Sequence, residues 1–162
     1  MTKERKPSYL HFDKAHYPWK ADINYRENPK SYRIGKGEQG VLICEPYKTE
    51  IGQHWRFKTP QIAKESSQKI FDLFKQYLDD DNFVGADMAR KFLQMGYTRA
   101  RRYANYKGGR KYDKKKNYAP LKRGTGEDEK AVAAAIFYEK WKAAEADESY
   151  AEKKACWKKE YG

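Results

Sequence analysis

Arginine, lysine and tyrosine side chains alternate through one stretch of the sequence, residues 98–126, and this pattern suits the binding of a polyphosphate. The stretch holds eleven basic residues and one acidic residue, in a chain whose net charge is +12. Basic groups neutralise phosphates and release counterions, while aromatic rings stack on unpaired bases. The pattern therefore predicts a nucleic-acid-binding segment that contacts mainly the phosphate backbone. The residues expected to bind are Arg99, Arg101, Arg102, Tyr103, Tyr106, Lys107, Arg110, Lys111, Lys114, Lys115 and Lys116.

The arginines at the start of this stretch can meet nucleic acid in two ways. In the first, residues 95–98 form the turn of a helix-turn-helix motif and residues 99–106 form a short recognition helix. In the second, the arginines and the basic residues after them grip the phosphate backbone without reading the base sequence, and fold partly upon contact. We expect the second, because Phe92 stands four residues before Gly96, where a helix-turn-helix usually has a small side chain.

A smaller anion site is predicted just before a helix. Residues 54–58 alternate basic and aromatic side chains, so a strand there would place the basic groups on one face and the two rings on the other. Arg56 and Lys58 then precede Thr59-Pro60, a pair typical of a helix start. Backbone N–H groups and the helix dipole at such a start favour negative charge. Packing of the same segment is the competing explanation.

Three further patterns could carry chemistry, and each has a simpler explanation. Residues 35–40 match GxGxxG, but we expect a strand after them and find no HRD or DFG motif, so a glycine hairpin is favoured and nucleotide binding stays open. Residues 79–81, three aspartates, diverge around a helix end rather than gathering around magnesium. His11, Asp13 and His16 lack a second cluster to complete a metal or acid–base site. We expect no metal, no cofactor and no catalytic residue.

Composition narrows the surroundings in which the protein works. Cys44 and Cys156 stand far apart with no Cys/His cluster, so neither a disulfide framework nor a zinc site is indicated. The longest apolar run, residues 131–138, is much shorter than the roughly twenty residues that span a bilayer. No apolar segment follows the basic N-terminal residues, so no signal peptide is predicted. We expect a cytoplasmic protein.

Changes in composition divide the chain into four parts. Residues 1–31 are expected to form an irregular arm that lays aromatic rings onto the body, and residues 32–106 form the core domain. Residues 107–126 are a basic linker, extended or disordered, and residues 127–162 are a long C-terminal helix that docks on the core. Aromatic residues make up 15% of the chain, so rings can replace the scarce aliphatic side chains in the core.

The core domain is predicted to have an α+β fold, a small antiparallel sheet packed with two or three helices. Residues 32–34 and 41–44 flank the glycine-rich stretch as the strands of a hairpin do, and residues 54–58 suit a further strand.

The helices of the core are predicted from caps and spacing. One should run from Pro60 to about Leu78, with Thr59 as its N-cap. A second should begin at Phe83, capped by Asp81 or Asn82, and should be interrupted at Gly96.

Three segments of the chain resemble a known family. They are residues 32–47 (YRIGKGEQGVLICEPY), residues 54–60 (HWRFKTP) and residues 83–112 (FVGADMARKFLQMGYTRARRYANYKGGRKY). They are similar to the domain-of-unknown-function family 4385, met in microbial and tailed-phage genomes. The resemblance covers about residues 35–112 well. It implies one compact domain that includes the Arg-Tyr segment, and it brings no activity, cofactor or catalytic residue.

The sequence thus favours a nucleic-acid-binding protein without catalytic activity, with DNA and RNA both open. The alternative is a protein-interaction module, an accessory or host-directed factor, that applies the basic surface to an acidic partner. An enzyme with an unrecognised site is the third hypothesis.

Overall fold

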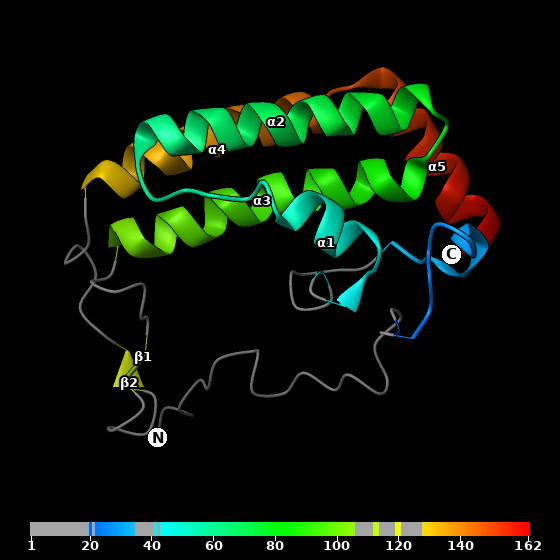
Figure 1. The fold of residues 1–162 in the computed structure, drawn as a ribbon, viewed down its shortest axis with the longest axis horizontal. Coiled ribbons are helices and arrows are strands. Elements are labelled where there is room, and N and C mark those ends of the chain that lie inside the picture. The colour runs from blue at the N-terminus through cyan, green and yellow to red at the C-terminus, as the bar shows by residue number, and fades with distance from the viewer. Residues whose placement is uncertain are drawn as a thin grey trace.

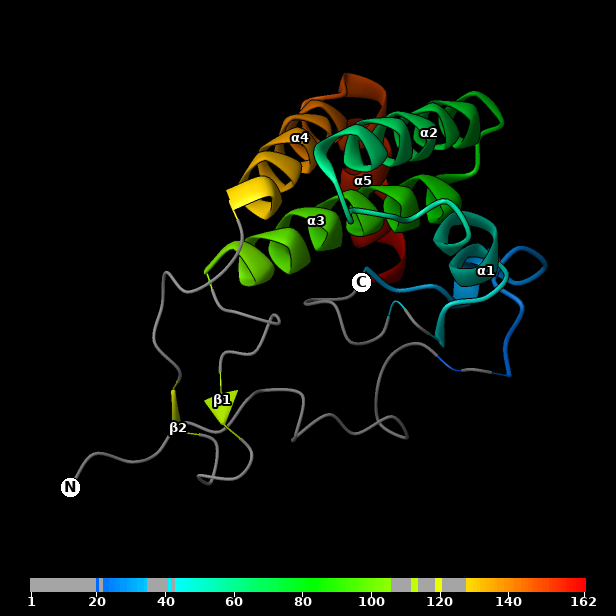
Figure 2. The same cartoon turned by 60° about the vertical axis from the view of Figure 1, so that its left-hand side comes forward.

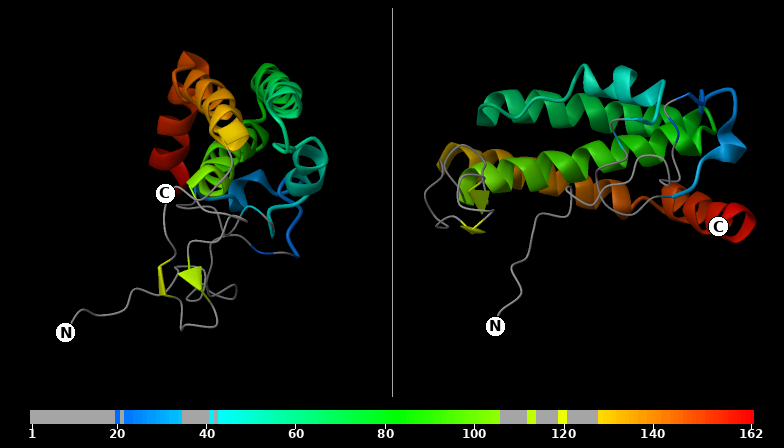
Figure 3. Two further views of the ribbon diagram at one scale, coloured as in Figure 1. Left: turned by 90° about the vertical axis from the view of Figure 1, so that its left-hand side faces the viewer. Right: turned by 90° about the horizontal axis from the view of Figure 1, so that it is seen from below.

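Three long helices form the body of the protein (Figure 1). The computed structural model describes residues 20, 22–34, 41, 43–105, 112–113, 119–120 and 128–162. The three helices are α2 (Pro60–Asp79), α3 (Phe83–Asn105) and α4 (Asp128–Glu145). Helix α3 packs on both of the others, and most extensively on α4, so it is the central helix. An end-on view shows the three as the corners of a triangle (Figure 3).

Smaller elements surround this bundle. A 3-10 turn, η2 (Pro29–Ser31), precedes the short helix α1 (Tyr47–Gly52), which lies against α3. Helix α5 (Glu148–Tyr161) follows α4 and also contacts α3, as Figure 2 shows from a second side. In the basic segment, β1 (Tyr112–Asp113) and β2 (Ala119–Pro120) pair antiparallel, with Tyr112 opposite Pro120.

The predicted α+β class is wrong, because the fold is helical. Residues 32–34, 43–44 and 54–58 form no strand, and the β pairing among the described residues is the two-residue ladder of β1 and β2. At residues 54–58 a side chain from a helix forms the backbone hydrogen bonds that a neighbouring strand would form. Ser66 Oγ on α2 donates to His54 O at 2.7 Å and accepts from Arg56 N at 2.9 Å. The glycine hairpin predicted at residues 35–40 lies outside the described residues.

The predicted start of α2 is confirmed, and its end at Asp79 is one residue beyond the prediction. Thr59 is the N-cap, and its side chain accepts a hydrogen bond from Ile62 N at 3.2 Å. The helix buries one face, as its apolar spacing predicts. Asn82 caps the next helix, because its Oδ1 accepts from Gly85 N at 3.0 Å. This resolves the choice that the sequence left open between Asp81 and Asn82.

The predicted interruption at Gly96 is wrong, because α3 continues through it to Asn105. A Cβ atom on Gly96 would lie 2.2 Å from Cδ1 of Phe137 on α4. The glycine therefore permits a close approach of two helices and does not end one. Since residues 95–98 are helical, the helix-turn-helix geometry is also wrong.

The single long C-terminal helix is wrong as well. It is broken into α4 and α5 at residues 146–147, where Asp147 is the N-cap of α5 and its Oδ1 accepts from Tyr150 N at 3.0 Å. Docking on the core is carried by α4, where Phe137 and Ala144 are buried, whereas the alanines at 151 and 155 on α5 are exposed.

The aromatic character of the core is confirmed. Tyr25, from the segment predicted as an arm, is fully buried, and its ring meets that of Tyr32 edge-on at 6.0 Å. Most of the largest fully buried side chains are aromatic: Tyr25, Tyr32, Tyr47, Tyr150, Phe74, Phe92 and Phe137. Rings therefore supply the area that the few aliphatic residues do not.

Candidate nucleic-acid interface

The last turns of α3 present three arginines at one end of the bundle. Arg101 is exposed, and Arg99 and Arg102 are partly buried. At about 100° per residue, Arg99 and Arg101 lie about 160° apart around the helix axis, with Arg102 between them. Ala100, on the opposite side, is fully buried. The three guanidinium groups therefore spread over the outward side of α3 and do not share a single face. We call these three residues the arginine fan.

Aromatic side chains from residues 54–58 pack along the same part of α3. The Trp55 ring meets Phe92 at 5.8 Å between centroids, and Cζ of Arg99 lies 5.9 Å from the Trp55 centroid. Further along, Phe57 meets Tyr103 at 6.0 Å. Tyr103 is thus part of a ring cluster that fixes residues 54–58 to the end of α3.

Arg56 and Lys58 alternate with those rings and are exposed. Both precede the N-terminus of α2, as predicted. The alternation of basic and aromatic side chains is therefore present although no strand forms. Because Trp55 and Phe57 contact Arg99 and Tyr103, the two basic groups that the sequence suggested separately lie at one end of the molecule. Binding of an anion by Arg56 and Lys58 stays a prediction.

Lys130 lies on the inner side of this ring cluster. The sequence analysis did not predict this position for it. Its Nζ atom donates to the backbone carbonyls of Phe57, at 3.2 Å, and Lys58, at 2.7 Å. It also lies 5.6 Å from the Phe57 centroid and 5.7 Å from that of Tyr103. The side chain is 9% exposed, so Lys130 supports the cluster and is not presented to a partner. A single lysine beside two acidic residues at a helix start gives no sequence signal for such a role.

The cations at this end differ from many others in their partners. Elsewhere, carboxylates pair with Arg26, Lys75, Arg90, Lys142 and Lys153. Within the part of the chain that the structure describes, no carboxylate forms an ion pair with the cations of the basic end, which are Arg56, Lys58, Arg99, Arg101 and Arg102. Among the described residues, therefore, no ion pair compensates the charge of these five cations.

Much of the predicted binding segment lies outside the described residues. This applies to Tyr106, Lys107, Arg110, Lys111, Lys114, Lys115 and Lys116, and also to the GxGxxG stretch at 35–40 and to His11, Asp13 and His16.

A buried polar network in the first turns of α3 was missed by the sequence analysis. Asp87 is fully buried and accepts hydrogen bonds from the hydroxyl of Tyr150, at 2.7 Å, from Arg90 Nη2, at 3.0 Å, and from the hydroxyl of Tyr32. Burial opposes its ionisation, yet Arg90 and the two hydroxyls hold the pKa of Asp87 below its ordinary value. A carboxylate three residues before an arginine inside an apolar helix was the available signal.

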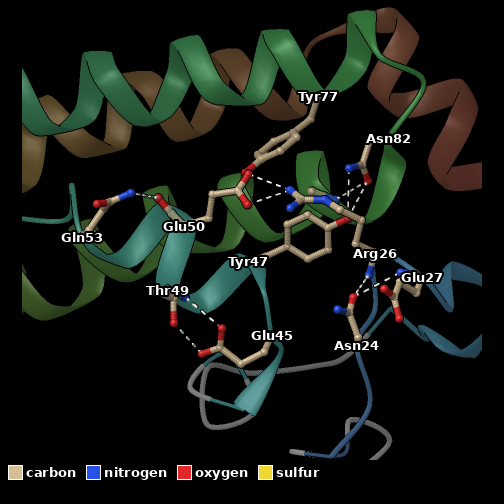
Figure 4. A network of polar contacts seen from close by, with 11 residues as sticks. Asn24, Arg26, Glu27, Glu45, Tyr47, Thr49, Glu50, Gln53, Tyr77 and Asn82 are labelled. Atoms are coloured by element: carbon tan, nitrogen blue, oxygen red, sulfur yellow. Dashed lines mark hydrogen bonds and ion pairs between the residues drawn. The ribbon is translucent and has the colours of Figure 1, made fainter.

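A second polar network ties the N-terminal residues to the bundle (Figure 4). Arg26 Nη2 lies 2.7 Å from both carboxylate oxygens of Glu50 on α1, and the hydroxyl of Tyr77 donates to Glu50 Oε1 at 2.6 Å. Burial opposes ionisation of Glu50, but the hydrogen bonds from Tyr77 and Arg26 keep its pKa below the usual value. Tyr47 and Asn82 exchange a hydrogen bond beside this pair. These groups satisfy one another, so the network serves the fold.

The described residues also bear on metal binding and on membrane insertion. In those residues no three His, Cys, Asp or Glu side chains gather as they would around a metal ion. No helix among them combines the length and the apolar character needed to cross a membrane.

The structure defines a helical bundle with one basic end, which is supported by aromatic rings. Comparison with protein families matches residues 16–160 to the family described as Domain of unknown function (DUF4385). The chain belongs to this family, which confirms the resemblance read from the three sequence segments and extends it over most of the length. No curated protein and no solved structure matches the chain.

Proposed function

We propose that this protein binds nucleic acid through phosphate contacts at the end of the bundle where α3 finishes and α2 begins. The observation that carries the proposal is the meeting of two basic groups around one ring cluster. Arg99 and Arg102 come from α3, and Arg56 and Lys58 come from the segment before α2. Rings of Trp55, Phe57 and Tyr103 hold the two groups together.

Electrostatics favour a polyanion as the occupant of this end. Cations that have no carboxylate partner in the described part of the chain repel one another, and a phosphate backbone offsets that repulsion while releasing its counterions. Arginine also binds phosphate through two N–H groups at once, whereas lysine acts as a point charge. An arginine fan spread around a helix suits contact with successive phosphates better than capture of one small anion.

Charge reversal tests this proposal. Fluorescence anisotropy with labelled duplex DNA, single-stranded DNA and RNA is measured on the natural chain and on a variant with Arg99→Glu and Arg102→Glu. Loss of two charge-assisted contacts should weaken binding at least about tenfold.

The matched control changes the same net charge at the opposite end of the molecule. Lys158 and Lys159 are exposed on α5, which lies far from the end of α3 in Figure 1. Lys158→Glu with Lys159→Glu should leave affinity within about twofold, once the small change in overall field is included. Equal weakening by the two variants would mean that binding follows net charge and not this end. Binding of an acidic polypeptide in preference to every nucleic acid would instead favour the protein-interaction alternative.

A further inference from the structure

Three aromatic rings meet on the outer side of the seam between α3 and α4. Tyr97, on α3, stacks on Trp141 of α4 with centroids 5.7 Å apart and planes inclined by 30°. Tyr138 meets Tyr97 at 5.1 Å and meets Trp141 edge-on at 5.7 Å. Trp141 Nε1 donates to Glu145 Oε1 at 2.6 Å, which fixes the indole ring in place. The rings therefore form an ordered cluster, which we call the seam cluster.

The seam cluster reaches solvent through Tyr138. Tyr138 is 44% exposed, and among the described residues only Val132 is a more exposed large apolar side chain, at 51%. Tyr97 and Trp141 are partly buried. Part of the Tyr138 ring stays in contact with water, and that part gains nothing from burial on folding. The arrangement does present ring surface to a partner.

Two cations, Arg101 and Lys142, lie beside the seam cluster, which also contacts the carboxylate of Glu145. Arg101 follows Tyr97 by four residues, so the two side chains are neighbours on one face of α3, and Arg101 is exposed. Nζ of Lys142 lies 4.2 Å from the Trp141 centroid and 5.5 Å from that of Tyr138. The ion pair of Lys142 with Glu145 is 3.7 Å long, with side chains 46% and 36% exposed. Such a pair is weak, so Lys142 can turn to a phosphate at small cost.

We infer that the seam cluster is a base-stacking surface for single-stranded nucleic acid, with Tyr138 as the ring on which a base stacks. The inference rests on the proposed function and specifies the form of the nucleic acid. Arg101 joins the two surfaces, since it belongs both to the arginine fan and to the face of Tyr97. A duplex keeps its base faces covered by their neighbours, whereas a single strand can place a base on a ring and its phosphates beside the cations.

Oligonucleotides that differ only in their bases test this inference. The natural chain is titrated with single-stranded oligodeoxynucleotides of one length, one carrying all its bases and one fully abasic, and with the corresponding single-stranded RNA. The two DNA strands carry equal charge, so phosphate contacts alone predict equal affinity. Stacking of one base predicts about tenfold tighter binding of the strand that carries bases. A clear difference between RNA and DNA would identify the sugar that the surface accepts.

Variants locate the effect on Tyr138. Tyr138→Ala should remove the advantage of bases over abasic sites, and Tyr138→Phe should keep it because the ring remains. The matched control is Val132→Ala, which trims the other large apolar side chain that α4 presents to solvent among the described residues and should change nothing.

The outcomes separate this inference from the proposed function. Equal binding of the base-carrying and abasic strands, or full retention of the difference in Tyr138→Ala, overturns the stacking surface. If charge reversal at Arg99 and Arg102 still weakens binding, the proposed function stands alone. If the natural chain binds no oligonucleotide, both are overturned.

Discussion

Asp87 shows how one side chain connects several segments of this fold. It lies on the central helix, while its partners Tyr32 and Tyr150 come from before α1 and from α5. Arg90 supplies the compensating charge from the next turn of α3. A buried carboxylate with this set of donors is held ionised, which makes its contribution to stability dependent on pH.

The first prediction concerns acid sensitivity. A carboxyl group whose pKa is lower in the folded than in the unfolded chain stabilises the fold at neutral pH, and this stabilisation is lost as pH falls below the ordinary value of about 4. The Asp87→Asn variant should be less stable at pH 7 by about 3 kcal/mol, because the buried Arg90 loses the carboxylate 3.0 Å away and keeps the more distant Glu145, at 3.9 Å. The variant should also lose less of its remaining stability on acidification than the natural chain. Urea denaturation across a pH series measures both effects.

A matched aspartate on the surface controls this experiment. Asp72 is exposed on α2 and accepts a hydrogen bond from Gln68 at 2.8 Å, which an asparagine can also accept. Asp72→Asn should keep the stability of the natural chain at pH 7 within about 0.5 kcal/mol. Parallel acid titration of stability in the natural chain and in Asp87→Asn would contradict the role given to Asp87.

At the scale of elements, the approach of α3 to α4 depends on the absence of a side chain at Gly96. A Cβ atom there would lie 2.2 Å from Phe137, well inside van der Waals contact. Alanine is the better helix former by about 1 kcal/mol, so propensity alone predicts that Gly96→Ala stabilises the protein. Packing predicts the opposite, because Phe137 is fully buried and cannot move freely.

We expect packing to prevail at Gly96. Gly96→Ala should lower the free energy of unfolding by about 2 kcal/mol, as measured by urea denaturation. Gly52→Ala is the matched control, since a Cβ there would meet Phe92 at an ordinary 3.5 Å, and its stability should stay within about 0.5 kcal/mol of the natural chain. Trimming the ring with Phe137→Leu in the Gly96→Ala background should recover part of the loss. Equal stability of the two alanine variants would contradict the close approach.

Local signals predicted some elements well and others badly. The start of α2 could be predicted because its cap and its apolar spacing act within the helix itself. A strand at residues 54–58 could not be excluded from the sequence. The alternation of basic and aromatic residues indicates only which side chains are covered, and it does not indicate whether the backbone pairs with another strand. Here α3 covers the rings, and Ser66 satisfies the backbone. The effect of Gly96 was predicted wrongly for a similar reason. This glycine makes room for the ring of Phe137, which lies forty-one residues further along the chain.

At the scale of the whole molecule, tertiary structure turns two weak sequence signals into one surface. Composition identified Arg99 and Arg102, and alternation identified Arg56 and Lys58. Their adjacency depends on contacts such as Phe57 with Tyr103 and Lys130 with the carbonyl of Lys58, which join distant parts of the chain. No local pattern predicts such contacts. The seam cluster escaped prediction for the same reason.

The salt dependence of binding tests the phosphate interface most directly. If about five cations contact phosphates, log affinity for duplex DNA should fall against log salt concentration with a slope of about −4. Replacing Arg99 and Arg102 by glutamine removes two of these contacts and should reduce the magnitude of the slope by about 2. Lys158→Gln with Lys159→Gln should leave the slope unchanged. A slope near zero for the natural chain, or the same slope after loss of both arginines, would contradict a phosphate interface at this end of the bundle.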